Sequence, residues 1–146
     1  MCHVKRLILV FTCLVFLTTS LCPTASAIEV SPRASLYLTG YTGSLSQGTK
    51  SGRIRVDFTV IATQISDYVG VSQIAIFEAD TNTRIAAIKG SVVNGLLRED
   101  ARSTTGSYTY YGKPGVTYYA VLTIYAEKDG GSDFRMYTTN NCTAPS

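Results

Sequence analysis

The sequence predicts an all-β protein, a single antiparallel sandwich of about seven strands. Three observations lead to this prediction. Several segments alternate apolar and polar residues with the two-residue period of a half-buried strand. After residue 27, no segment keeps the 3.6-residue apolar period of a helix. Clusters of Gly, Asn, Asp and Ser separate the candidate strands at turn positions.

The first 27 residues read as a signal peptide and not as part of the folded domain. A basic start precedes an apolar run over residues 7–17, and Ala25 to Ala27 supply the small residues of a cleavage site. The run is shorter than the roughly 18 to 20 residues needed to span a bilayer. We therefore expect cleavage after Ala27, secretion to the extracellular side, and one domain over residues 28–146.

Two segments carry the clearest strand pattern. In "RIRVDFTV" (53–60) the even-numbered residues are apolar and the odd-numbered residues polar. In "VTYYAVLTIYAE" (116–127) the even-numbered residues are again apolar, and the odd-numbered residues are mixed. Shorter candidate strands cover residues 35–42, 72–79, 84–89, 107–111 and 132–138.

Two connections are also of interest. Asp129-Gly130-Gly131 is expected to form a hairpin turn, because glycine accepts the positive φ of tight turns. Segment 90–102 has three interpretations: a crossover between sheets, a short extra strand or one helical turn. Its Leu96-Leu97 pair is expected to be buried.

Residues 28–146 lack the side chains of several common chemistries. The sole histidine and three of the four cysteines lie in the signal peptide. Without histidine, Ser-His-Asp and Cys-His catalysis and histidine-ligated metals are excluded. Cys142 is expected to be a free thiol in a frayed tail, with an intermolecular disulfide as the alternative. No phosphate-binding or dinucleotide motif is present, so no cofactor is expected.

The charge balance gives little support to a nucleic-acid or membrane partner. Lys5 and Arg6 account for two of the thirteen basic residues, which leaves eleven against ten acidic residues after cleavage. No basic run alternates with aromatic residues, and there is no basic amphipathic helix. We expect neither nucleic-acid binding nor membrane insertion.

Acidic residues raise two further possibilities, a calcium site and a carboxylate-based glycosidase. The calcium interpretation does not match the EF-hand spacing, and Asp129 is already explained by the hairpin turn. A small sandwich also offers little cleft for a glycosidase. We therefore expect no metal and no enzymatic activity. The candidate pairs are Glu78 with Asp80, Glu99 with Asp100, and Asp129 with Asp133.

Tyr118 has a predicted structural role. In "KPGVTYYAV", Pro114 and Gly115 precede Tyr118 at the interval found in fibronectin-type domains, which this stretch resembles. In fibronectin-type and immunoglobulin-like sandwiches, such a tyrosine bends its hydroxyl back to an upstream backbone group at a corner between sheets. The resemblance implies that these three residues are architectural.

Other aromatic residues are predicted to share one outer sheet face. Alternation places Tyr119 and Tyr125 opposite the apolar face of segment 116–127. Such a face can stack on sugar rings or bury against a partner protein, although tyrosine also favours strands for its own sake. The predicted binding residues are Tyr119, Tyr125, Arg135 and Tyr137, with Phe134 and Met136 pointing inward and Phe77 as a further candidate.

Several stretches resemble a family of small secreted proteins of Gram-positive bacteria to which no activity is attached. They are "SLYLTGYTGSL", "GRIRVDFTVIAT", "SDYVGVSQIAIFEAD" and "YAEKDGGSDFRMYTT". The resemblance implies secretion and an immunoglobulin- or fibronectin-III-like sandwich. We expect a non-enzymatic binding module for a protein or a cell-surface component, with carbohydrate as the second form of that idea. The alternative is a structural or matrix protein that assembles through edge strands.

Overall fold

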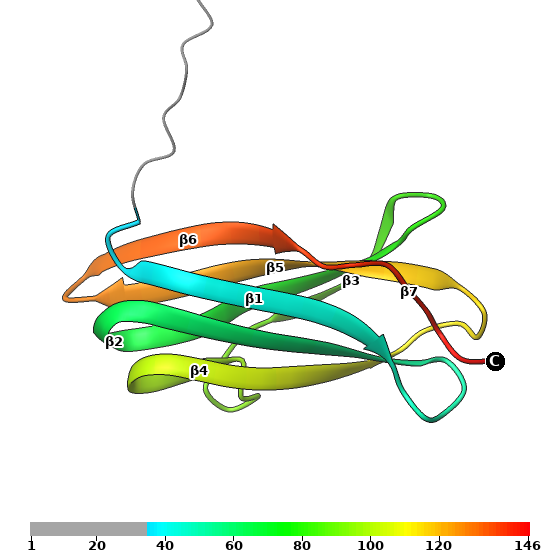
Figure 1. Cartoon of the computed structure of the whole chain (residues 1–146), viewed down its shortest axis with the longest axis horizontal. Coiled ribbons are helices and arrows are strands. Elements are labelled where there is room, and N and C mark those ends of the chain that lie inside the picture. The colour runs from blue at the N-terminus through cyan, green and yellow to red at the C-terminus, as the bar shows by residue number, and fades with distance from the viewer. Residues whose placement is uncertain (1–34) are drawn as a thin grey trace, which may run out of the picture. The chain divides into compact units, whose positions relative to one another are not determined.

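The computed structural model describes residues 35–146, so the predicted signal peptide and its cleavage site lie outside the described residues. The all-β expectation is confirmed for this part of the chain (Figure 1). None of its residues forms a helix that is long and apolar enough to cross a membrane. The strands are β1 (Leu38–Gln47), β2 (Arg53–Glu78), β3 (Thr83–Lys89), β4 (Leu97–Tyr111), β5 (Thr117–Lys128), β6 (Gly131–Thr138) and β7 (Cys142–Thr143).

The long strand β2 organises one antiparallel sheet. Its first half, residues 53–61, pairs with β1 on one edge and with β4 on the other. Its second half, residues 66–78, pairs with β5 and β3 and also with the start of β4. β6 and β7 extend the sheet by pairing with β5. All strands therefore belong to one hydrogen-bonded sheet.

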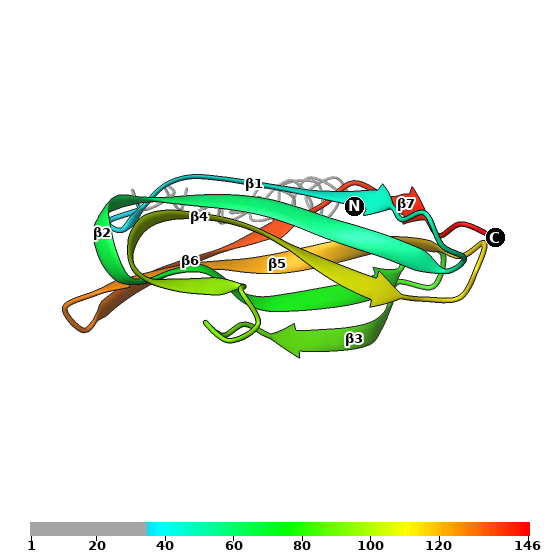
Figure 2. The same ribbon diagram turned by 90° about the horizontal axis from the view of Figure 1, so that it is seen from below.

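The sheet curls into a half-barrel around a single core (Figure 2). The pairing of β2 with β4 is interrupted between Ile61 and Ser66, and the strand bends there. Inward side chains from both halves of β2 meet those of β5, and their burial drives the fold. The fully buried residues with the largest side chains are Tyr118, Ile54, Ile74, Ile76, Leu96, Leu122, Ile124, Val56, Val60, Val69 and Val71.

Two segments differ from the predicted strand pattern, residues 61–71 and residues 90–102. The sequence suggests separate strands over 53–60 and 72–79, but the intervening residues continue β2 and bury Val69 and Val71. Segment 90–102 is neither a crossover between two sheets nor a short extra strand, because residues 90–96 connect β3 to β4 and residues 97–102 begin the long strand β4. Leu96 is fully buried in the turn after β3, whereas Leu97 begins β4. No helical turn forms there.

Side chains close the open side of the half-barrel at β1. The Asn140 amide accepts a hydrogen bond from the Leu45 N–H and donates one to the Leu45 carbonyl, at 3.0 and 2.8 Å. It thereby replaces a neighbouring strand at that residue. The rings of Tyr41 and Tyr137 meet edge to face with centroids 6.0 Å apart. These contacts connect β1 to the C-terminal strands.

Candidate functional site

The candidate site lies on the outer face of the second half of β2, β5 and β6. Along β5, Tyr118, Leu122 and Ile124 are buried, whereas the odd-numbered residues point away from the core. Tyr119 and Tyr125 therefore lie on the outer side, as the alternation predicts. We call this surface the aromatic face. It consists of Phe77, Tyr119, Val121, Tyr125, Phe134 and Met136.

The predicted orientation of β6, with Arg135 and Tyr137 outward, is wrong. Arg135 pairs with the buried Ile124, and Tyr137 pairs with the buried Leu122, so both side chains lie on the core side of the sheet. Tyr137 packs against the core. In "DFRMY" (133–137), Phe134 and Met136 share one side of the strand, and Tyr137 lies on the other side with Asp133 and Arg135. Both sides carry a large hydrophobic residue, so alternation alone does not tell which side faces the core.

Phe134 and Met136 take the outward positions. Phe134 lies opposite Tyr125, and Met136 lies opposite Thr123. Their side chains are 62% and 70% exposed. Large apolar side chains with this exposure, side by side on one strand, are unfavourable in water and typical of a surface that another molecule covers. The sequence signal for these two residues is the apolar pair itself, but the pattern predicts that the pair faces the core.

The end of the aromatic face that Phe77 and Tyr119 form is rigid. The rings of Phe77 and Tyr119 stack with centroids 5.0 Å apart and an interplanar angle of 5°. The Tyr119 hydroxyl donates a hydrogen bond to the side-chain oxygen of Asn82. A ring fixed at both its face and its hydroxyl loses little conformational entropy when a partner binds.

The opposite end of the aromatic face, next to Tyr125, is acidic. Tyr68 lies between Glu99 on β4 and Glu127 on β5. The charge of Glu99 and a hydrogen bond to it raise the pKa of Tyr68. The Tyr125 hydroxyl donates to Glu127, and burial together with this bond raises the pKa of Tyr125. In the described part of the chain, neither glutamate forms an ion pair with lysine or arginine.

Arg135 and Asp133 fasten the start of β1. Arg135 donates to Asp133 at 2.7 Å, and the Ser35 hydroxyl donates to the same carboxylate. Burial opposes ionisation of Asp133, but the bond from Ser35, the charge of Arg135 and the backbone amides of Tyr37 and Leu36 together hold its pKa below the ordinary value. This is a structural contact on the core side of the sheet.

Tyr118 lies at the β4–β5 connection, which carries the chain from the first half of the curled sheet to the second. Its buried hydroxyl accepts a hydrogen bond from the Lys113 N–H at 2.8 Å. Pro114 and Gly115 form the middle of the turn, and the φ of 76° at Gly115 requires glycine. The bond to upstream backbone is the one that the spacing predicts.

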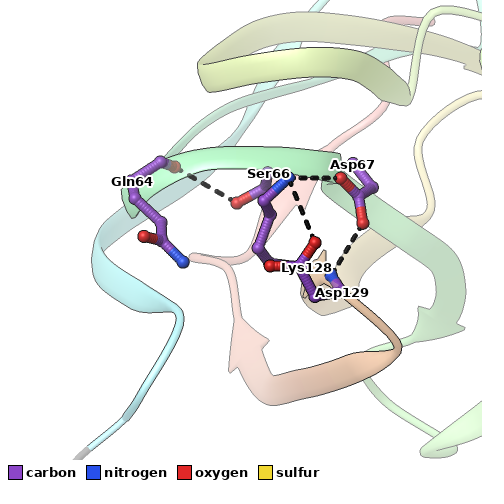
Figure 3. A network of polar contacts seen from close by, with 5 residues as sticks. All are labelled: Gln64, Ser66, Asp67, Lys128 and Asp129. Carbon is purple, nitrogen blue, oxygen red and sulfur yellow. Dashed lines mark hydrogen bonds and ion pairs between the residues drawn. The ribbon is translucent and has the colours of Figure 1, made fainter.

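A polar network fixes the β5–β6 hairpin to the bend of β2 (Figure 3). Lys128 donates to Asp67 at 2.8 Å, and the Asp129 N–H donates to the other oxygen of the same carboxylate, also at 2.8 Å. The Lys128 bond, followed by the Asp129 amide, lowers the pKa of Asp67. Asp129 and Gly130 have φ of 51° and 78°, as a two-residue hairpin turn requires.

The other acidic candidates are dispersed. Asp129 and Asp133 have the separate partners described above. Glu78, at the end of β2, lies 4.0 Å from the Lys113 ammonium and accepts a bond from Thr81. Within residues 35–146, no group of three or more His, Cys, Asp or Glu side chains is placed to hold a metal ion.

Cys142 does not lie in a frayed tail, contrary to the prediction. It belongs to β7 and pairs with Tyr118. Its thiol is free, and burial raises its pKa. A raised pKa keeps the thiol protonated and makes it a poor nucleophile.

No protein-family model matches the chain, and a search of curated proteins finds no match.

Proposed function

We propose that this chain is a secreted, non-enzymatic binding protein whose aromatic face recognises a protein at the cell surface. The observation that carries the proposal is the exposure of Phe134 and Met136 beside Tyr125. Aromatic side chains and methionine are enriched at the centres of protein interfaces. Methionine adapts its shape to a partner, and the stacked Phe77 and Tyr119 rings provide a rigid anchor.

The acidic end of the face defines the partner's chemistry. Glu99 and Glu127 border the apolar residues, and Tyr125 and Tyr68 hold them in place. A partner with an apolar patch flanked by lysine or arginine complements this arrangement. Charge pairs at such a rim are solvent-exposed, so the association should weaken as salt is raised.

Export and the finer fold class belong to the same proposal. A basic start, a short apolar run and the site at Ala25 to Ala27 support cleavage after Ala27. N-terminal sequencing of the exported protein should begin at Ile28. A membrane-retained chain that begins at Met1 would contradict secretion. The hydrogen bond of Tyr118 at the corner supports an immunoglobulin- or fibronectin-like relationship. In this interpretation, the bend of β2 after Ile61 corresponds to the position where such domains divide into two sheets.

The binding experiment compares two surface variants of the mature chain. Immobilised wild type is used to capture proteins from its native surroundings, and the captured protein is identified and its dissociation constant measured. The variant Tyr125→Ala, Phe134→Ser, Met136→Ser should weaken binding at least tenfold. Ile65→Ser, which removes an equally exposed apolar side chain from the bend of β2, should bind like wild type.

Two results would contradict this function. Equal binding of the captured protein by wild type and the triple variant would remove the aromatic face from recognition. Light scattering that shows a wild-type oligomer and a monomeric triple variant would instead identify a second copy of the chain as the occupant, which is the assembling structural role.

A further inference from the structure

The outer face of the first half of the sheet has a different chemistry from the aromatic face. Its side chains come from β1, the first half of β2 and β4. Over residues 42–46, 55–59 and 105–109, all of the outward side chains except Arg55 and Asp57 are serine or threonine, and the 41% exposed Ile61 lies next to them. We call this surface the hydroxyl face, and it consists of Thr42, Ser44, Ser46, Arg55, Asp57, Thr59, Thr105, Ser107 and Thr109.

The register aligns these side chains in rows across the three strands. The first row is Thr42, Thr59 and Thr105, and the second is Ser44, Asp57 and Ser107. The backbone of Gly43, Phe58 and Gly106 lies between the two rows. The result is a shallow, open depression of about 410 Å³ that both rows line.

The polar groups of the hydroxyl face are already oriented. The hydroxyls of Thr59 and Thr105 lie 3.2 Å apart and share a hydrogen bond. Arg55 and Asp57 form an ion pair at 2.7 Å, which places donors and acceptors next to one another. Short serine and threonine side chains lose little rotamer freedom on binding. Such a surface suits a ligand that presents many hydroxyl groups.

One end of the hydroxyl face adds an aromatic ring and an arginine. Tyr111, which is 62% exposed, lies directly opposite Arg53 on the same side of the sheet. The aliphatic part of Arg53 lies over Gly48, and its Nε is buried with no hydrogen-bond partner. Arg53 forms no ion pair in the described part of the chain, and Lys50 lies in the turn just before it.

This end is complementary to an anion attached to a ring that presents an apolar face, as the C–H face of a sugar does. A planar guanidinium binds a carboxylate through two parallel hydrogen bonds. The exposed ring of Tyr111 offers a stacking surface beside it. With Arg55 paired to Asp57, the positive charges that can attract a ligand at this end are those of Arg53 and the neighbouring Lys50.

We propose that the hydroxyl face binds an extended glycan that carries carboxylate groups. Tyr111 stacks on one sugar ring, Arg53 binds the carboxylate, and the rows of serine and threonine bind ring hydroxyls further along. From Arg53 to Thr59 the face extends on the order of 20 Å along the strand, enough for several sugar rings. A neutral glycan would leave the charge of Arg53 without a partner, and a protein would find no apolar anchor in the rows of serine and threonine.

The test titrates the mature wild-type chain with a hyaluronan oligosaccharide, in which glucuronate alternates with a neutral sugar. NMR chemical shifts should change at the hydroxyl face and at Tyr111, and not at the aromatic face. A neutral cello-oligosaccharide of equal length should bind at least tenfold more weakly. Dextran sulfate serves as the control for charge attraction alone and should also bind at least tenfold more weakly.

Four variants localise the site, and none of them replaces a residue of the buried core. Arg53→Gln and Tyr111→Ser should each weaken hyaluronan binding at least tenfold, and Thr105→Glu should abolish it by adding a negative charge to the face. Arg53→Lys should bind with intermediate affinity, since lysine keeps the positive charge but cannot donate two parallel hydrogen bonds to a carboxylate. Matched changes on β3, Arg84→Gln and Thr83→Glu, should bind like wild type.

The proposal is overturned by any of four results. These are no hyaluronan binding by wild type, equal binding of the neutral oligosaccharide, equal binding of dextran sulfate, or unchanged affinity in Arg53→Gln and Tyr111→Ser variants whose thermal unfolding matches wild type. None of them bears on the aromatic face, whose protein partner is tested separately.

Discussion

The two outer faces of the curled sheet share one core and differ in the chemistry of most of their exposed side chains. Outside the first half of β2, serine and threonine dominate, and the exposed charges of Arg55 and Asp57 pair with one another. Outside the second half, Phe134 and Met136 are exposed and the neighbouring Glu127 has no cationic partner in the described chain. Every second side chain of a strand faces outward, and the chemistry of these side chains can vary without changing the core.

The first prediction tests whether both faces depend on the same core. Leu122→Ala should lower the free energy of unfolding by about 2 to 5 kcal/mol, because it leaves a cavity where inward side chains from both halves of the sheet meet. The neighbouring outward change Thr123→Ala should alter it by less than about 0.5 kcal/mol. Chemical denaturation measures both. Equal effects would mean that β5 does not separate core from surface.

The second prediction concerns the connection between the two halves. Tyr118→Phe should lower the free energy of unfolding by about 1 to 1.5 kcal/mol, because it removes the acceptor of the Lys113 N–H. Ligand binding at either face should not change, since Tyr118 is buried. Unfolding by urea is the measurement, and an unaltered midpoint would withdraw the structural role of Tyr118.

The third prediction sharpens the comparison at the start of β1. Because the folded protein holds the pKa of Asp133 below its ordinary value of 3.8, ionised Asp133 stabilises the fold fully above that pH. The stabilisation should be lost as the pH falls through the lower folded pKa. Asp133→Asn should destabilise the protein by about 1 kcal/mol or less at pH 7 and by less in acid. Asp80→Asn, an exposed control, should leave the free energy of unfolding at pH 7 unchanged. A pH-independent difference between wild type and Asp133→Asn would contradict this role.

Sequence reasoning succeeds where one face of a strand is uniformly apolar. Over residues 53–60 and 116–127 the buried side follows directly from alternation, and Tyr119 and Tyr125 are placed correctly on the outer side. It fails on β6, where Phe134 and Met136 look like core residues. Their register is set by pairing with β5 through the Asp129-Gly130 turn, and not by their own hydrophobicity.

The hydroxyl face illustrates a second limit. Segment 105–109 lies far in the sequence from segments 42–46 and 53–59, and each of the three reads as an ordinary solvated strand. Only the pairing of both β1 and β4 with β2 aligns their hydroxyls into rows and places Tyr111 opposite Arg53. Alternation does not predict the continuous strand β2 either, because residues 61–71 mix exposed and buried positions at the bend.

The fourth and smallest expected effect concerns the stability of β6. Replacing both Phe134 and Met136 with threonine should change the free energy of unfolding by no more than about 0.5 kcal/mol, because neither side chain is in the core. Tyr137→Ala should be clearly more destabilising, since that ring packs on the core and on Tyr41. The reverse order in thermal denaturation would mean that β6 faces the other way.

The most direct test of the account is the affinity of the captured protein partner for the variant Phe134→Ser, Met136→Ser, measured by calorimetry beside wild type and Ile65→Ser. We expect the double variant to fold like wild type and to bind more weakly by about 1 to 2 kcal/mol or more, in line with aromatic hot spots. Ile65→Ser should bind normally. Wild-type affinity in the folded double variant would contradict the central claim that the outward side chains of β6 form the recognition surface.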